Sequence, residues 1–305
     1  KITYGRMEAD VFATCVKYDD LVEALKRVDV IKRHFNSYPL EFDIVPAFGI
    51  YVIEDTELPI ELMLDRAKMA AKTIKGQYLN NYAFYTDDMG TALEEEQQIV
   101  NEMVNALETE QFLVYFQPKY NLTSKLPIGA EGLVRWEHPE WAMIPPGKFI
   151  PIFGKNGFIT KLDYFVWNKV CFMIRGWLDE GMKPNPISVN MSRVNLYNPN
   201  IVKVLCDLVD SYNVPRDLLQ LELTESAYAD ASAAMKEKVQ RFREEGFQVL
   251  MDDFGSGYSS LNVLKDIEVD VLKIDMRFFE TSDVDGRGEN IIASVVRMAK
   301  WLNIP

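Results

Sequence analysis

From Phe112 onward, short apolar segments alternate with segments whose apolar residues recur at helical spacing. The helical segments include Thr160–Glu180, Asn200–Tyr212 and Ala231–Glu245, and Gly246 suits a helix end because glycine adopts a left-handed backbone without strain. Apolar strands separated by amphipathic helices predict a parallel sheet covered by helices, either open or closed as a barrel. The predicted strands are Leu113–Gln117, Ala130–Trp136, Ile187–Met191, Leu219–Leu223, Gln248–Met251 and Asp270–Ile274.

The part of the chain before this alternation predicts a smaller α+β unit. Alternation around Val11, Ala13 and Cys15 favours a strand preceded by a turn at Gly5-Arg6. The further predicted elements are a helix that begins at Asp19-Asp20, a strand over Phe42–Val52, a helix from Pro59 to Gly76, and a strand over Asn81–Tyr85.

An acidic segment follows this unit. Its residues Val100, Met103, Val104 and Leu107 have the i, i+3, i+4, i+7 spacing of an amphipathic helix. We therefore expect three regions: a small unit over residues 1–88, a connector helix over 89–110, and the alternating α/β region over 111–305.

Composition narrows the possible functions. The chain has 48% hydrophobic and 26% charged residues, as expected for a soluble protein with two domains, and no apolar run of about eighteen residues. Three scattered cysteines suit a reducing cytoplasm better than a disulfide framework. A net charge of −13 argues against a nucleic acid polymer as the partner, and two histidines exclude a histidine-rich metal site.

Polar residues interrupt the predicted strands towards their ends. Carboxylates and amides that meet at one mouth of a barrel would repel one another unless a divalent cation joined them. Ligands that are all oxygen atoms point to a hard ion, Mg²⁺ or Mn²⁺. The residues concerned are Gln117, Glu131, Asn190, Glu222, Asp252, Asp253 and Lys273.

Each of these residues also has a purely structural interpretation. Asp252 and Asp253 could pair with a lysine or arginine, and Glu131 could pair with Arg135 on the same side of its strand. Asn190 and Ser192 could complete a turn, and Lys273 could bridge Asp275. Taken as one set, however, these residues favour the metal site.

The same segments carry the motifs FQP, EGLVRW, NMS, ELTE, DDFGSGYSSL and KID, in that order. In this set and spacing the chain resembles the EAL family of cyclic di-GMP phosphodiesterases from about Phe112 onward. The resemblance implies a modified (β/α)₈ TIM-type barrel that hydrolyses cyclic di-GMP to linear pGpG with two Mg²⁺ or Mn²⁺ ions. It also implies a possible homodimer through this domain.

The resemblance also implies roles for individual residues. Glu131, Asn190, Glu222 and Asp252 match ligands of the first ion, and Asp253 matches a ligand of the second. Lys273 matches the residue that orients or activates the attacking water. The remaining matches are Gln117, Leu133 and Arg135, which contact the dinucleotide, and Glu225, which anchors the loop after Asp253.

The N-terminal unit resembles the second half of a GGDEF domain, the family that makes cyclic di-GMP from GTP. The resemblance rests on Gly5-Arg6 and on the helix DRAKMAAKTIKG. Where the family has Gly-Gly-Asp-Glu-Phe, this chain has Glu8-Ala9-Asp10-Val11-Phe12. The glycines and the metal-binding glutamate are absent, so a regulatory role is expected in place of cyclase activity.

The chain stops at Pro305, where the resemblance predicts a seventh and an eighth strand. We therefore expect a segment of a longer protein, catalytically incomplete as written. Two alternatives to the enzyme remain open. One is a receptor that binds cyclic di-GMP without cutting it and signals through the connector helix, and the other is a structural partner with a vestigial site.

Overall fold

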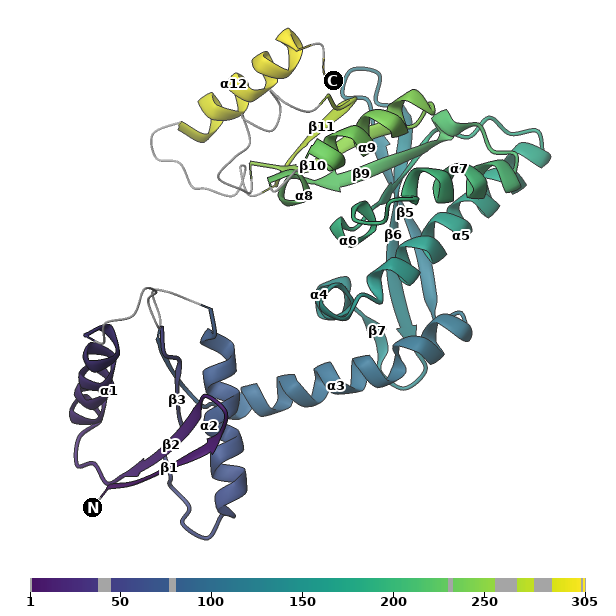
Figure 1. Cartoon of the computed structure of the whole chain (residues 1–305). Coiled ribbons are helices and arrows are strands. Elements are labelled where there is room, and N and C mark those ends of the chain that lie inside the picture. Colours follow the sequence, from purple (N-terminus) through teal and green to yellow (C-terminus); the bar gives the residue numbers. More distant parts are fainter. Residues whose placement is uncertain are drawn as a thin grey trace. The chain divides into compact units, whose positions relative to one another are not determined.

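The computed structural model of this chain describes residues 2–37, 45–76, 81–229, 233–255, 268–276, 287–302 and 304 (Figure 1). The chain divides into two compact units, Lys1–Gln98 and Ile99–Pro305. The boundary falls inside helix α3, Asp87–Glu108. Three sequence expectations lie partly outside the described residues: 42–44 of one predicted strand, 231–232 of one predicted helix, and the loop after Gly255.

The N-terminal unit is a small α/β region. Its elements are β1 (Ile2–Glu8), β2 (Val11–Val16), α1 (Leu21–Asn36), β3 (Phe48–Ile50), α2 (Ile60–Ile74) and β4 (Tyr82–Phe84). Strands β1 and β2 form an antiparallel hairpin, and β3 and β4 form a parallel pair. The predicted start of α1 is confirmed, because the Asp20 side chain accepts a hydrogen bond from the backbone N–H of Val22 and caps the helix.

The turn predicted at Gly5-Arg6 is wrong. Both residues lie inside β1, and the hairpin turns at Ala9-Asp10. Ala9 has a φ of 34°, and its carbonyl accepts a hydrogen bond of 2.8 Å from Arg6 Nε. A side-chain contact across the hairpin therefore closes the turn, and glycine placement alone did not reveal it.

Gly49 permits the close approach of β3 to α2. A Cβ atom there would lie 1.8 Å from the carbonyl oxygen of Ala67 and 2.6 Å from the backbone nitrogen of Ala71. Because helix backbone cannot yield as a side chain does, Gly49→Ala is expected to destabilise this unit by about 3 kcal/mol. Hydrogen exchange of the α2 amides measures the loss. Gly5→Ala is the control, since no atom lies within 4 Å of the added carbon, and equal exchange in both variants would contradict the prediction.

The second unit is an α/β fold around one sheet. Its described strands are β5 (Phe112–Tyr120), β6 (Pro127–His138), β7 (Ala142–Ile144), β8 (Ile187–Asn190), β9 (Leu219–Thr224), β10 (Gln248–Phe254) and β11 (Val271–Ile274). Among the described residues the sheet order is β11-β10-β9-β8-β6-β5, and β7 pairs with β6. The pairs β6–β8, β8–β9, β9–β10 and β10–β11 are all parallel.

Helices cover the sheet on the side away from its polar face. They are α4 (Pro146–Asn156), α5 (Ile159–Asp179), α6 (Arg193–Leu196), α7 (Ile201–Ser211), the 3₁₀ helix Arg216–Leu218, α8 (Glu225–Ala229), α9 (Ala233–Glu244) and α12 (Arg287–Trp301). Buried residues from this layer and from the strands, such as Trp167, Phe242, Leu221 and Val249, form one core. Gly246 ends the α9 region with a φ of 95°, as predicted.

The expectation of a wholly parallel sheet is wrong at its first pair. Strands β5 and β6 are antiparallel, because the connection between Tyr120 and Pro127 is too short for a crossover helix. Strand β7 was also missed, since three residues carry too little pattern to be recognised.

The inner side predicted for the connector helix is confirmed at Val100, Met103 and Leu107, which pack against a buried apolar cluster, and is wrong at Val104. Ile99 and Ala106 of α3 are buried, whereas Val104 is 45% exposed. Met103 and Leu107 pack partly against the same apolar cluster as Ile99, so the buried side of α3 does not include Val104. Within the described ranges, none of the helices has both the length and the apolar character that crossing a bilayer requires.

Candidate metal centre

Several of the polar residues singled out in the sequence, among them Asn190, Glu222 and Asp252, share one face of the sheet. In β9, Leu219, Leu221 and Leu223 are fully buried in the core, so Glu222 points to the opposite face. The strand register shows which residues of the neighbouring strands lie on the same face. Glu222 lies opposite Asn190 in β8 and opposite Leu250 in β10. Residues two positions along a strand share a face, so Asp252 lies on it as well.

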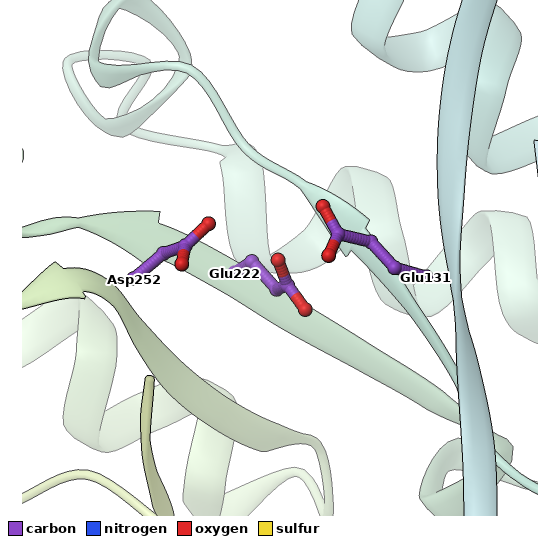
Figure 2. A group of neighbouring side chains, drawn as sticks. All are labelled: Glu131, Glu222 and Asp252. Atoms are coloured by element: carbon purple, nitrogen blue, oxygen red, sulfur yellow. The ribbon is translucent and has the colours of Figure 1, made fainter. Parts of the chain in front are cut away.

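Three carboxylates meet on this face. Oxygen atoms of Glu131, Glu222 and Asp252 all lie within 4.8 Å of one another. Figure 2 shows the three carboxylate groups pointing toward a shared space from β6, β9 and β10. Glu222 is 1% exposed, and a buried cluster of this kind requires compensating positive charge.

Two lysines supply this charge. The ammonium nitrogen of Lys273 lies 2.9 Å from Glu131 Oε2, 2.6 Å from Glu222 Oε2 and 3.1 Å from Asp252 Oδ2. The ammonium of Lys119 lies 2.8 Å from Glu222 Oε1. Glu222 is therefore bracketed by two cations, one on each carboxylate oxygen.

The lysines set the charge state of the cluster. Burial raises the pKa of Glu131 above its usual value, and the nearby Glu222 carboxylate raises it further, against the effect of Lys273. Burial also raises the pKa of Glu222, but Lys273 and Lys119 together outweigh burial and hold that pKa below its usual value. Burial lowers the pKa of Lys273, yet its carboxylate partners produce a net rise. Glu222 is thus held more firmly in its ionised form than Glu131.

Asn190 and Glu225 contact this region from neighbouring elements. The Asn190 side chain donates a hydrogen bond of 3.3 Å to Glu131 Oε1, which places it beside the three carboxylates. Glu225 is 1% exposed at the start of α8 and accepts a hydrogen bond of 2.8 Å from the backbone N–H of Gly255. It therefore holds the backbone that follows Asp253.

The other residues singled out in the sequence lie less centrally. Asp253 is exposed, with a φ of 56°, and its backbone N–H donates to Asp252 Oδ1. Gln117 is exposed and lies opposite Glu131 across the β5–β6 pair. Leu133 and Arg135 follow Glu131 on the same face of β6, and the Arg135 guanidinium donates to the carbonyl of Val134.

Two expectations about the site need correction. Glu131 is not at the end of its strand but lies well inside β6, which runs on to His138. Lys119 was missed altogether, although the alternation of β5 gave a signal for it, since Lys119 stands two positions after Gln117 and so shares its face.

A buried hydrogen-bond network supports the segment around Asn190. Trp167 Nε1 donates a bond of 3.0 Å to the Asn190 carbonyl. Asp163, 7% exposed on α5, accepts bonds at Oδ2 from the backbone N–H of Ser192 and from Asn195 Nδ2. Burial raises the pKa of Asp163 from 3.8 to about 6, although these hydrogen bonds oppose the rise.

This raised pKa predicts a pH-dependent effect of Asp163→Asn. The folded protein binds the Asp163 proton more tightly than the unfolded chain does. The contribution of protonated Asp163 to the free energy of unfolding is therefore complete below pH 3.8 and is lost as pH rises through about 6. An asparagine oxygen can accept both hydrogen bonds without charge. From pH 4 to pH 7 the variant should therefore gain on the order of 2 kcal/mol in unfolding free energy relative to the natural protein. Urea unfolding at both pH values measures this, and a difference that does not change with pH would contradict it.

The donor set fits a divalent ion. Three carboxylates against two ammonium groups leave one uncompensated negative charge, and the oxygen atoms already converge. Carboxylate and amide oxygens are the ligands of hard cations such as Mg²⁺ and Mn²⁺. The residues placed to hold an ion are Glu131, Glu222 and Asp252, with Asn190 adjacent.

Three carboxylates that converge on one face of an α/β sheet form a set of oxygen ligands that could hold a divalent ion. Sequence comparison matches residues 100–305 to the EAL domain, and the chain belongs to the EAL domain family. Glu131 of the EGLVRW segment lies within the matched residues and in the cluster described above.

Curated relatives agree with this assignment. The chain is 31% identical over 310 residues to the bifunctional diguanylate cyclase/cyclic di-GMP phosphodiesterase MucR of Pseudomonas aeruginosa, covering 99% of this chain and 45% of MucR. It is 32% identical over 200 residues to the probable cyclic di-GMP phosphodiesterase PdeB of Escherichia coli, covering 66% of this chain and 38% of PdeB. The chain thus spans less than half of either relative.

A solved structure shows the same fold. The phosphodiesterase of P. aeruginosa MucR in complex with c-di-GMP superimposes with a TM-score of 0.64 and 32% sequence identity. The match covers 68% of this chain and 84% of that structure. The second unit is therefore an α/β fold of the TIM-like EAL type.

Proposed function

We propose that this protein hydrolyses one phosphodiester bond of cyclic di-GMP to give linear pGpG, using two Mg²⁺ or Mn²⁺ ions. The main observation in support is the convergence of Glu131, Glu222 and Asp252 on one face of an EAL-type sheet. Membership of the family and the phosphodiesterase descriptions of MucR and PdeB support the choice of substrate.

In this proposal the residues take the following parts. Divalent ions bound here would neutralise the phosphate and lower the pKa of a bound water. Lys273 reaches three carboxylates at once and so stands where it can orient the attacking water by donating a hydrogen bond. Glu225 accepts a hydrogen bond from the backbone N–H of Gly255 and so holds the backbone segment that leads from Asp253 to Gly255. The full assignment is Glu131, Asn190, Glu222 and Asp252 for the first ion, Asp253 for the second, and Gln117, Leu133 and Arg135 for the dinucleotide.

The N-terminal unit is proposed to be a degenerate GGDEF-like domain with a regulatory role. Its signature positions, Glu8 to Phe12, span the β1–β2 hairpin, and Val11 stands where the family has its metal-binding glutamate. The alignment with MucR, a bifunctional relative, includes this part of the chain. We expect no cyclic di-GMP from GTP.

The test is incubation of the full-length protein with cyclic di-GMP and either Mg²⁺ or Mn²⁺, followed by chromatography. Metal-dependent appearance of pGpG is the expected result. Calorimetry separates the alternative: a receptor would bind the dinucleotide with metal removed and show no turnover when metal is restored. Absence of pGpG with both metals would overturn the proposal. If the dinucleotide also failed to bind, the alternative of a structural partner with a vestigial site would hold.

A further inference from the structure

Lys119 has no part in the proposed chemistry, yet it contacts the most buried member of the acidic cluster. Its ammonium lies 2.8 Å from Glu222 Oε1, while Lys273 lies 2.6 Å from Glu222 Oε2. The two oxygens of one carboxylate are thus divided between two lysines. Oε2 contacts Lys273, the lysine that also contacts Glu131 and Asp252.

Ser188 keeps Lys119 in this position. The Ser188 side chain is fully buried on β8, and its hydroxyl donates a bond of 3.3 Å to the Ala130 carbonyl. Its oxygen can then accept the bond of 2.6 Å from Lys119. The ammonium therefore joins three strands, reaching from β5 to Ser188 on β8 and Glu222 on β9.

Lys119 also changes the charge of the cluster. Glu131, Glu222 and Asp252 carry three negative charges, against one positive charge each on Lys119 and Lys273. Without Lys119 the uncompensated charge would double from −1 to −2. In a partly buried site, that change raises the repulsion among the carboxylates and strengthens their attraction for a divalent cation.

We propose that Lys119 is a positioning residue of the metal centre. It fixes the Glu222 carboxylate and supplies part of the positive charge that keeps the three carboxylates together before an ion binds. This inference rests on the proposed function only in taking the cluster to be the site of a divalent ion. The consequence is a site that is formed in advance and that binds its metal less tightly than an uncompensated cluster would.

The test is Mn²⁺ binding to Lys119→Met, measured by calorimetry, together with thermal unfolding in chelator. We expect a lower melting temperature without metal and Mn²⁺ binding about tenfold tighter than in the natural protein. Lys119→Gln keeps hydrogen-bonding capacity without charge and should show the same changes in melting temperature and Mn²⁺ affinity as Lys119→Met. It provides the test if the methionine variant does not fold. Lys119→Arg, which keeps the charge, should retain the natural affinity.

Lys169→Met is the matched control. Lys169 forms a salt bridge of the same 2.8 Å length, but with the exposed Glu110 and outside the cluster. It should leave Mn²⁺ affinity unchanged. Unchanged Mn²⁺ affinity in Lys119→Met and Lys119→Gln would make Lys119 merely structural, because such a lysine lowers the melting temperature alone. Weaker affinity would mean that Lys119 fixes Glu222 without its charge limiting metal binding. Either result overturns the proposal.

The outcomes separate this inference from the proposed function. Tighter Mn²⁺ binding in the Lys119 variants without any pGpG from the natural protein would uphold the role of Lys119 and overturn the phosphodiesterase. Production of pGpG with unaltered Mn²⁺ affinity in the variants would do the reverse. Absence of Mn²⁺ binding in every protein would overturn both.

Discussion

Glu131→Gln is expected to lower the rate of cyclic di-GMP hydrolysis by at least about 10³-fold, which corresponds to about 4 kcal/mol of lost transition-state stabilisation. The substitution keeps the size of the side chain and an oxygen that can accept from Asn190 or Lys273. It removes one of the three charges that converge in the cluster. The effect should therefore fall on metal-dependent chemistry and leave the fold intact.

Formation of pGpG at saturating Mn²⁺ measures this effect, with thermal unfolding as the check on folding. Glu137→Gln is the matched control, because Glu137 lies on the same strand but is exposed and outside the cluster. It should retain full activity. Hydrolysis by Glu131→Gln within tenfold of the natural rate would show that the cluster is not the catalytic centre.

The second large effect concerns stability and needs no assumption about the substrate. Glu222→Gln is expected to lower the unfolding free energy of the metal-free protein by about 3 to 5 kcal/mol at neutral pH. The Glu222 side chain is 0% exposed and pairs with both Lys119 and Lys273. Removing its charge leaves two partly buried ammonium groups with less compensation.

Chemical unfolding in chelator measures this loss. The control is Glu110→Gln, which removes a carboxylate from a salt bridge of the same 2.8 Å length, but with a side chain that is 71% exposed. An exposed pair contributes little, so the control should lose no more than about 1 kcal/mol. Equal losses in the two variants would mean that burial does not strengthen the Glu222 pairs.

Much of this site could be predicted from local pattern. The alternation of Leu219, Leu221 and Leu223 places Glu222 on the face opposite the helices, and the structure has it there. Family motifs pointed to the same residues. The parallel order from β6 to β10 also follows from strands separated by helices, because only a crossover connection of that length returns the chain in parallel.

Local pattern could not show which way a short connection turns. The segment between β5 and β6 carries no helix, and the structure makes it an antiparallel hairpin. Likewise, the first hairpin turns at Ala9-Asp10, where the Arg6 side chain donates to the Ala9 carbonyl. The propensities of single residues predict neither the antiparallel pairing of β5 with β6 nor the position of this turn.

By itself, the sequence determined most of the strands and helices of the second unit, the face of β9 on which Glu222 lies, and the family. Only the tertiary structure decided which charges meet. Lys273 reaches Glu131 across 142 positions of sequence, and Lys119 reaches Glu222 across 103. Such pairs are set by strand order and register, which arise from packing the whole sheet against its helices, so no local period encodes them.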